Sequence, residues 1–321
     1  MRVVVLAGGV GGAKLADGAV LWAADQSDPV EITVVVNTGD DLEVHGLSVS
    51  PDIDTVMYTL AGLANDELGW GLAGDTWSAA GMLEAYGQPT WFRVGDRDLA
   101  THLVRTEGLR AGRRLTEVTA DLCRALRVPA RILPMTDDPV RTQLRAEADW
   151  LDFQDYFVRR SHRDTVTGIR FGGIESARPS PEVLAALETA DRILIAPSNP
   201  FVSIGPILAL PGLEAAIRSS GAPVVAVSPL VGGAALRGPA DRMLESLGEE
   251  ASALGVARTY AGRWPDLIGG WLIDDQDAAL ASAIAALGPR PFVTGTVMRS
   301  PLDRRALAAA GVSLADALAE H

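Results

Sequence analysis

The feature that most constrains the fold of this chain is a glycine-rich turn between an apolar run and a helical pattern. The apolar run covers residues 2–7, and the turn reads Gly8-Gly9-Val10-Gly11-Gly12-Ala13-Lys14. A helical pattern continues from about residue 13 to residue 24, and a second apolar run covers residues 31–36. These segments predict a strand, a helix and a second parallel strand, which form the repeating unit of an α/β sheet.

The same pattern returns later in the chain. Two β-branched runs, at residues 191–196 and 223–227, flank a predicted helix at residues 211–219. Buried parallel strands have this continuous apolar character. Two further strand-like runs, at residues 271–273 and 291–293, are expected to complete the same sheet.

The fold class predicted from these units is α/β, with a Rossmann-like parallel sheet as its core. We expect a single α/β domain over residues 1–321. Between the two strand–helix–strand units, residues 59–164 carry Leu, Ala and Arg at helical spacing. This region is predicted to be an α-rich insertion within the domain.

The glycine turn is a candidate site for a phosphate. Glycines let the backbone approach an anion closely, and the start of a helix offers unpaired N–H groups at the positive end of its dipole. Leu15 stands where a P-loop has Ser or Thr, and the spacing is not that of a dinucleotide fingerprint. A tight turn without a ligand is the alternative. The candidate substrate-binding residues here are Gly8, Gly9, Gly11, Gly12 and Lys14.

Carboxylates crowd two loops that are predicted to face the same crevice. Asp40 and Asp41 follow the second strand, and Asp52 and Asp54 follow shortly afterwards. Ligands of open α/β sheets bind at the carboxyl ends of the strands, and clustered carboxylates beside a phosphate suit Mg²⁺. One of the aspartates could instead act as a general base, and helix capping is the alternative without a ligand.

A third loop, residues 196–206, follows the strand at residue 193. Two prolines and a glycine restrict it, and Ser198, Asn199 and Ser203 supply neutral hydrogen-bonding groups. Rigid polar loops at strand ends are commonly binding loops. An N-cap role for Ser203 is compatible with this prediction.

Charge and cysteine content exclude several classes of protein. The 28 basic and 41 acidic residues give a net charge of −13, which disfavours a nucleic-acid or anionic membrane surface. No stretch is apolar and long enough to span a bilayer. The one cysteine, Cys123, cannot form an intramolecular disulfide. We therefore expect a cytoplasmic protein with small-molecule substrates and no nucleic-acid or membrane partner. A homodimer is a separate expectation, which charge and cysteine content do not address.

In the order and spacing of its motifs, the chain resembles the 2-phospho-L-lactate transferase family (CofD/FbiA) of coenzyme F-420 biosynthesis. The resemblance covers nearly the whole chain. The motifs that carry it are Gly8–Lys14, Asn37-Thr38-Gly39-Asp40-Asp41, Ser50–Tyr58, Gly95-Asp96-Arg97-Asp98, Leu133–Pro139, Phe153-Gln154-Asp155, Pro197-Ser198-Asn199-Pro200 and Ser203-Ile204-Gly205-Pro206.

The resemblance implies a Mg²⁺-dependent transferase. Its substrates would be a guanosine diphosphate-linked three-carbon acid and the deazaflavin Fo, and GMP would leave. By position, Asp40 and Asp54 are implied as catalytic and metal-binding carboxylates, and Asp54 and Arg93 as contacts to the deazaflavin. The glycine turn and the third loop are implied as the guanosine diphosphate site. Trp91-Phe92 before Arg93 is similar to the actinobacterial branch, whose donor carries enolpyruvate.

Two alternatives remain open from the sequence. The first is a non-catalytic regulator that binds nucleotide sugars, because the related gluconeogenesis factors have a similar glycine turn and an aspartate-bearing second loop. The second is a Rossmann dehydrogenase, which would require an acidic residue where Asn37 stands.

Overall fold

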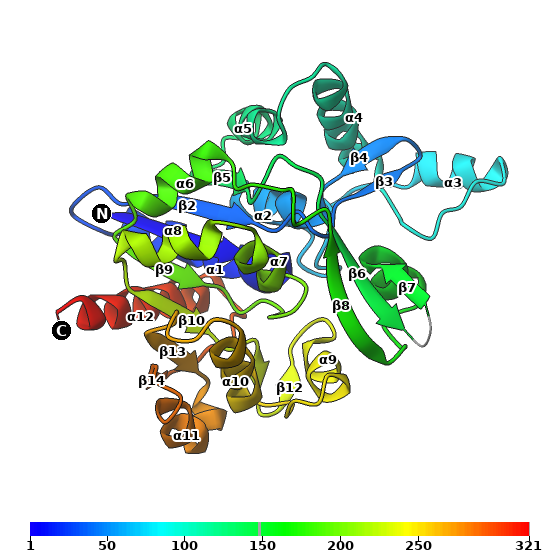
Figure 1. Ribbon diagram of the computed structural model, residues 1–321. Helices are drawn as coiled ribbons and strands as arrows, with labels where there is room; N and C mark the ends of the chain where they lie inside the picture. The colour runs from blue at the N-terminus through cyan, green and yellow to red at the C-terminus, as the bar shows by residue number, and fades with distance from the viewer. Residues whose placement is uncertain (147–148, 321) are drawn as a thin grey trace.

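The computed structural model describes residues 1–146 and 149–320, and its centre is a sheet of seven parallel strands (Figure 1). From edge to edge the strands are β14 (Arg290–Val293), β13 (Gly270–Ile273), β10 (Val224–Val227), β9 (Arg192–Ile195), β1 (Arg2–Ala7), β2 (Glu31–Val36) and β5 (Arg131–Pro134). The sheet confirms the predicted Rossmann-like core, including the two C-terminal strands.

Helices cover both faces of the sheet because its strands are apolar on both faces. In β1, Val4 and Leu6 face one layer, and Val3 and Val5 face the other. The first layer holds α6 (Pro181–Glu188), α7 (Ile204–Ala209), α8 (Leu213–Ser220) and α10 (Ala253–Arg263). The second holds α1 (Gly9–Ala24), α2 (Pro51–Leu60), α5 (Leu115–Ala125) and α12 (Pro301–Ala319). Figure 1 shows α6, α7 and α8 in front of the sheet and α1 behind it.

The remaining elements extend outward from this core, and α3 projects farthest (Figure 1). The helices are α3 (Ser78–Ala85), α4 (Asp96–Arg110), α9 (Ala240–Ser246) and α11 (Ala281–Ala285), with a π-helical turn (Asp155–Arg159) and a 3-10 turn (Asp275–Leu280). The strands are the pair β3 (Leu42–Val44) and β4 (Leu47–Val49), the pair β11 (Leu230–Val231) and β12 (Ala234–Ala235), and the sheet of β6 (Arg141–Ala146), β7 (Asp149–Asp152) and β8 (Val166–Gly172). No helix of the described residues has the length and apolar character needed to cross a bilayer.

Residues 59–164 differ from the α-rich insertion expected from their spacing. They contain α3, α4 and α5, but they also contain β5 of the central sheet and the antiparallel strands β6 and β7. β5 has four residues, too few for periodicity to separate a strand from a helix. β6 alternates buried with more exposed positions, as an antiparallel strand with one solvated face does.

Two helices also differ from the sequence-based expectation. α1 begins at Gly9 rather than near residue 13, so most of the glycine turn belongs to the first helical turn. α12, which packs along α1, is not among the helices expected from the sequence. The two helices approach closely at Gly18, where an added Cβ would overlap the backbone oxygen of Arg304.

Gly18→Ala should therefore destabilise the protein by about 1–3 kcal/mol, as overpacking does in tight contacts, less the small gain in helix propensity. Urea denaturation measures the change. The control is Gly262→Ala in α10, where an added Cβ meets open space, and it should leave stability unchanged or raise it by up to about 1 kcal/mol. Equal shifts in the two variants would contradict the described packing of α12 on α1.

Candidate functional site

The glycine turn after β1 is closed by a carboxylate from the first turn of α2. Asp52 Oδ1 accepts a hydrogen bond from the backbone amide of Gly9 at 2.8 Å, and Asp52 Oδ2 accepts one from the side-chain amide of Asn37 at 2.9 Å. Gly9 adopts φ +62°, a conformation that glycine tolerates best. An added Cβ at Gly8 would lie 2.7 Å from Asp52 Oδ2. The first two loops therefore meet, as their positions at strand ends predict.

The loop after β9 packs against the other side of the turn. The hydroxyl of Ser198 donates to the backbone oxygen of Gly8 at 2.7 Å. An added Cβ at Gly11 would overlap the backbone oxygen of Pro197, and one at Gly12 would lie 3.1 Å from Ser198 Oγ. The glycines thus allow close contact between protein loops as well as exposing backbone amides.

Asn199 and Ser203 have different environments in this loop. Asn199 Oδ1 accepts hydrogen bonds from the amides of Phe201 and Val202, at 2.9 and 3.3 Å, and so stabilises its own turn. Ser203 is the N-cap residue of α7, as predicted, but its side chain makes no capping hydrogen bond there. An added Cβ at Gly8 would lie 2.7 Å from Ser203 Cβ, so Ser203 adjoins the glycine turn.

Asp40 and Asp52 are buried with few compensating charges, and the neighbouring Asp41 is half-buried. Asp40 is 5% exposed, and within residues 1–146 and 149–320 its Oδ1 has no hydrogen-bond partner. Burial raises the pKa of Asp40 well above its usual range, and the negative charge of Asp52 raises it further. Burial also raises the pKa of Asp52 to about 6 and that of Asp41 to about 7. A bound cation would favour the charged form of all three.

Asp54 lies on the other side of α2, in a buried ion pair with Arg105 of α4. Arg105 Nη1 donates to Asp54 Oδ2 at 3.1 Å, and Arg105 Nη2 donates to Asp54 Oδ1. The guanidinium is fully buried. Both oxygens of Asp54 are therefore engaged, whereas the carboxylate that most affects Asp40 is that of Asp52. The joint role of Asp40 and Asp54 as catalytic and metal-binding carboxylates stays a prediction.

A polar network surrounds this ion pair. Asp54, Asp98 and His102 have ligand atoms within 4.8 Å of one another, a spacing that could hold a metal ion. However, Arg105 Nη1 lies 3.2 Å from His102 Nδ1, and because arginine only donates, this nitrogen must accept. The proton then sits on His102 Nε2, 3.4 Å from Asp98 Oδ2, and the hydroxyl of Tyr58 donates to Asp98 Oδ1 at 2.7 Å. The network is an ion-pair cluster joining α2 to α4.

The side chain of Lys14 reaches the segment that precedes α12. Its Nζ donates to the backbone oxygen of Met298 at 3.1 Å. Burial lowers the pKa of Lys14, and the positive charges of Arg304 and Arg237 lower it further. Sequence spacing gave no signal that these two arginines lie near the only lysine.

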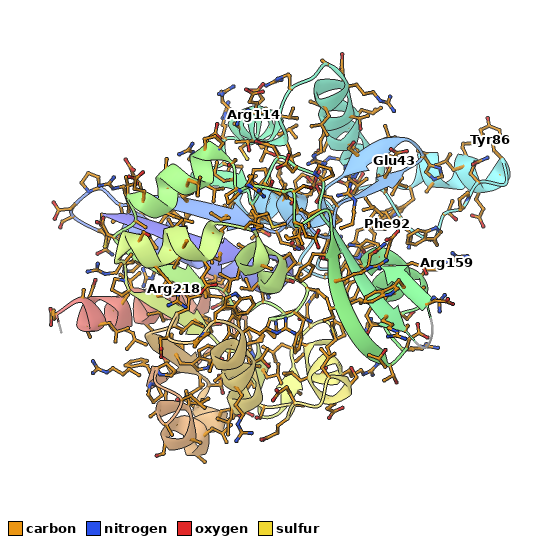
Figure 2. The ribbon with its side chains drawn as sticks, in the orientation of Figure 1. Glu43, Tyr86, Phe92, Arg114, Arg159 and Arg218 are labelled. Carbon is orange, nitrogen blue, oxygen red and sulfur yellow. The ribbon has the colours of Figure 1, made fainter. Side chains whose placement is uncertain are left out.

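Arg93 lies in an exposed aromatic segment between α3 and α4. Its guanidinium carbon is 4.3 Å from the ring centroid of Trp77, and Trp91 and Phe92 meet edge to face at 5.9 Å. In Figure 2, Phe92 lies on the side of the molecule that carries α3 and the β6–β8 sheet, and Tyr86 points outward from α3. An Arg93 ion pair with a neighbouring aspartate, the alternative to substrate binding, is not found in the described residues.

The Gly95–Asp98 run joins the starts of α3 and α4 through hydrogen bonds. The carboxylate of Asp96 accepts from the amides of Ser78 and Ala79 at 2.9 Å and so caps α3. In return Asp75 accepts from the amides of Arg97 and Asp98, at 2.8 and 3.1 Å, and caps α4. Sequence spacing alone could not show this reciprocal capping, because the two partners are about twenty residues apart.

The chain matches a family model described as 2-phospho-L-lactate transferase CofD, and the match spans residues 3–288. The matched range contains the glycine turn, both carboxylate loops and the third loop. The chain belongs to the CofD family. It is accordingly a transferase, as the resemblance of its motifs predicts.

Several similar proteins carry the name phosphoenolpyruvate transferase. The protein from Kitasatospora aureofaciens is 48% identical over 293 residues, which cover 90% of this chain and 89% of that one. The Streptomyces griseus protein is 44% identical over 98% of this chain and 99% of its own length. The Thermobifida fusca protein is 44% identical over the full length of both chains.

A crystal structure of a UPF0052-family protein from Bacillus halodurans has the same fold. Its TM-score is 0.64 at 16% identity, and the alignment covers 97% of this chain and 98% of that one. The family match favours the transferase over the nucleotide-sugar-binding regulator. Asn37 follows β2, at the position where a Rossmann dehydrogenase would need an acidic residue, and its side-chain amide donates to Asp52. This position therefore disfavours the dehydrogenase.

Asp54→Asn should lower stability as well as activity, because it leaves the buried Arg105 guanidinium without its counter-charge. The expected loss is about 3–5 kcal/mol, measured by chemical denaturation. Asp121→Asn on the exposed face of α5 is the control and should change stability by less than about 1 kcal/mol. Unchanged stability in Asp54→Asn would instead support a role for Asp54 in turnover alone.

Proposed function

We propose that the protein transfers a phosphoenolpyruvyl or 2-phospho-L-lactyl group from a guanosine diphosphate-linked donor to the ribityl hydroxyl of Fo, releasing GMP, in coenzyme F-420 biosynthesis. The observation that carries this proposal is the family match over residues 3–288, which contains buried carboxylates beside a glycine turn. The name phosphoenolpyruvate transferase, shared by several relatives, favours enolpyruvate as the donor acid.

The phosphates of the donor are assigned to the glycine turn, where the first amides of α1 can donate to an anion. The amide of Gly9 donates a hydrogen bond to Asp52. A phosphate at this amide would meet the negative charge of Asp52. Donor binding therefore requires either that Asp52 moves or that a cation lies between the two anions.

Mg²⁺ is the cation that these residues fit. Asp40 offers a buried oxygen without a hydrogen-bond partner among the described residues, and the adjacent charge of Asp52 would be neutralised by a divalent ion. We assign Asp40 and Asp52 as its protein ligands, because the Arg105 guanidinium already neutralises the charge of Asp54, whereas the partners of Asp52 are neutral amides. When bound, the ion would neutralise charge on the phosphates of the donor.

The proposed transfer is a direct displacement. The acceptor oxygen bonds to the phosphorus that carries the three-carbon acid, the bond from that phosphorus to the GMP oxygen breaks, and the hydroxyl proton passes to a carboxylate. Asp41 suits this last role, because burial raises its pKa to about 7 and its Oδ1 has no hydrogen-bond partner in the described part of the chain. Positioning and charge neutralisation suffice for such a transfer.

The flat acceptor is assigned to the aromatic segment before α4. Trp77 already carries the Arg93 guanidinium over its ring, and planar guanidinium groups stack on aromatic faces and also donate hydrogen bonds. Asp54 was expected to contact the acceptor with Arg93. Its bonds to Arg105 also hold α4, and with α4 this segment, against α2.

Asp40→Asn should abolish Mg²⁺-dependent transfer while keeping the fold, because it removes a buried charge that burial already disfavours. Mass spectrometry of the product formed from Fo and the guanylated donor should show a fall of at least about a hundredfold. The thermal transition should stay or rise, and Asp121→Asn should react at the wild-type rate. A wild-type protein that forms no product from these substrates would refute the proposed function, and a fully active Asp40→Asn would refute the metal assignment.

Arg93→Ala should weaken Fo binding by about tenfold to a hundredfold, the value of a hydrogen bond from a charged group. Fluorescence titration with Fo measures this, and GDP affinity should not change. Arg159→Ala is a control on another exposed arginine, shown in Figure 2. Equal Fo affinity in the Arg93 variant and the wild type would place the acceptor elsewhere.

A further inference from the structure

Arg237 joins two loops that are far apart in the sequence. Its Nη1 donates to the backbone oxygen of Leu68 and its Nη2 to that of Asp66, both at 3.2 Å. Both acceptors are neutral carbonyls, and in the described residues Arg237 has no carboxylate partner within 4.0 Å. A guanidinium has five N–H donors, so three are left after these two bonds.

The guanidinium lies beside the first turn of α1. An added Cβ at Gly69 would overlap Arg237 Nη1 and would lie 3.5 Å from the side chain of Val10, the second residue of α1. Gly69 and Val10 also line, with Lys14, a small cavity of about 20 Å³. Arg237 is therefore held at the helix end that carries the glycine turn, on the side where Lys14 lies.

Positive charge accumulates at this place although the protein is strongly acidic. Arg304 reaches it from α12 and is paired with Asp17 and Asp66, at 3.1 and 3.5 Å. Lys14 and Arg237 donate hydrogen bonds only to carbonyl oxygens among the described residues, although Asp66 lines the same small cavity as Lys14. Two cations that lie close together without carboxylate partners repel each other, and an anion between them would remove this repulsion.

We propose that Arg237 is a donor-binding residue that, with Lys14, binds an anionic group of the donor at the start of α1. The group is either a phosphate or the carboxylate of the three-carbon acid. This inference rests on the proposed function, because it takes the donor to be an anion at the glycine turn. The carbonyls of Asp66 and Leu68 hold the guanidinium in place before the donor arrives, which lowers the entropy lost on binding.

The test compares Arg237→Gln and Arg237→Lys with the wild type by calorimetric titration of three probes: pyrophosphate, phosphoenolpyruvate and GDP. Arg218→Gln is the matched control, because Arg218 on α8 also donates to a backbone carbonyl, that of Pro265 (Figure 2). We expect Arg237→Gln to lose about tenfold or more in affinity, and Arg237→Lys to recover most of it through its charge. A loss with all three probes identifies a phosphate contact, and a loss with phosphoenolpyruvate alone identifies the carboxylate.

Four results would overturn the inference: no binding of any probe by the wild type, equal affinities in the wild type and Arg237→Gln, an equal loss in Arg218→Gln, or Arg237→Lys as weak as Arg237→Gln. The last would mean that Arg237 only joins the two loops. A titration with UDP separates this inference from the proposed function. Arg237-dependent binding of pyrophosphate without a preference for GDP over UDP retains the inference and refutes the guanosine donor.

Discussion

The hydrogen bonds of Asp52 hold the start of α2 against the glycine turn, and the arrangement of the site depends on them. One carboxylate accepts from the amide of Gly9 and from the side chain of Asn37, and so connects the loop after β1, the loop after β2 and α2. Because Asp52 is buried, these bonds offset part of the cost of its charge. The same carboxylate accepts the hydrogen bond of the Gly9 amide, which an anionic ligand would also use. The contact that shapes the turn is thus also the one that a ligand must share or displace.

The two carboxylates of the first turn of α2 differ in whether a cation neutralises them. Asp54 faces α4 and is matched by the buried Arg105. Asp52 faces Asp40, and neither has a cationic partner among the described residues. A buried ion pair contributes to structure, whereas buried unmatched carboxylates favour a cation or a proton. Asp54 on one side of α2 therefore stabilises the structure, whereas Asp52 and Asp40 on the other side are suited to binding a cation or a proton.

The cations around the first turn of α1 also differ in whether a carboxylate neutralises them. Arginine from α12 is neutralised by two aspartates, while Lys14 and Arg237 contact carbonyl oxygens. Lys14 comes from α1, Arg237 from the loop after β12 and Arg304 from α12. Three distant parts of a chain with net charge −13 therefore supply the local positive charge. The last of these parts lies beyond residue 288, where the family match ends. The C-terminal helix thus contributes to the surroundings of the turn although it lies outside the matched residues.

Local patterns in the sequence suffice to predict the parallel sheet, the glycine turn at the end of β1 and the contact of this turn with the aspartate-bearing loop after β2. These follow from apolar runs, glycine spacing and the rule that parallel strands end at one edge, all of which are local or topological. Tertiary structure alone decided that Asp40 adjoins Asp52 and that Asp54 pairs with Arg105, because the direction of each side chain depends on how α2 is rotated against its neighbours. It also decided the positions of β5, α12 and Arg237. Short strands and single arginines carry no periodic signal, and their partners are far away in the sequence.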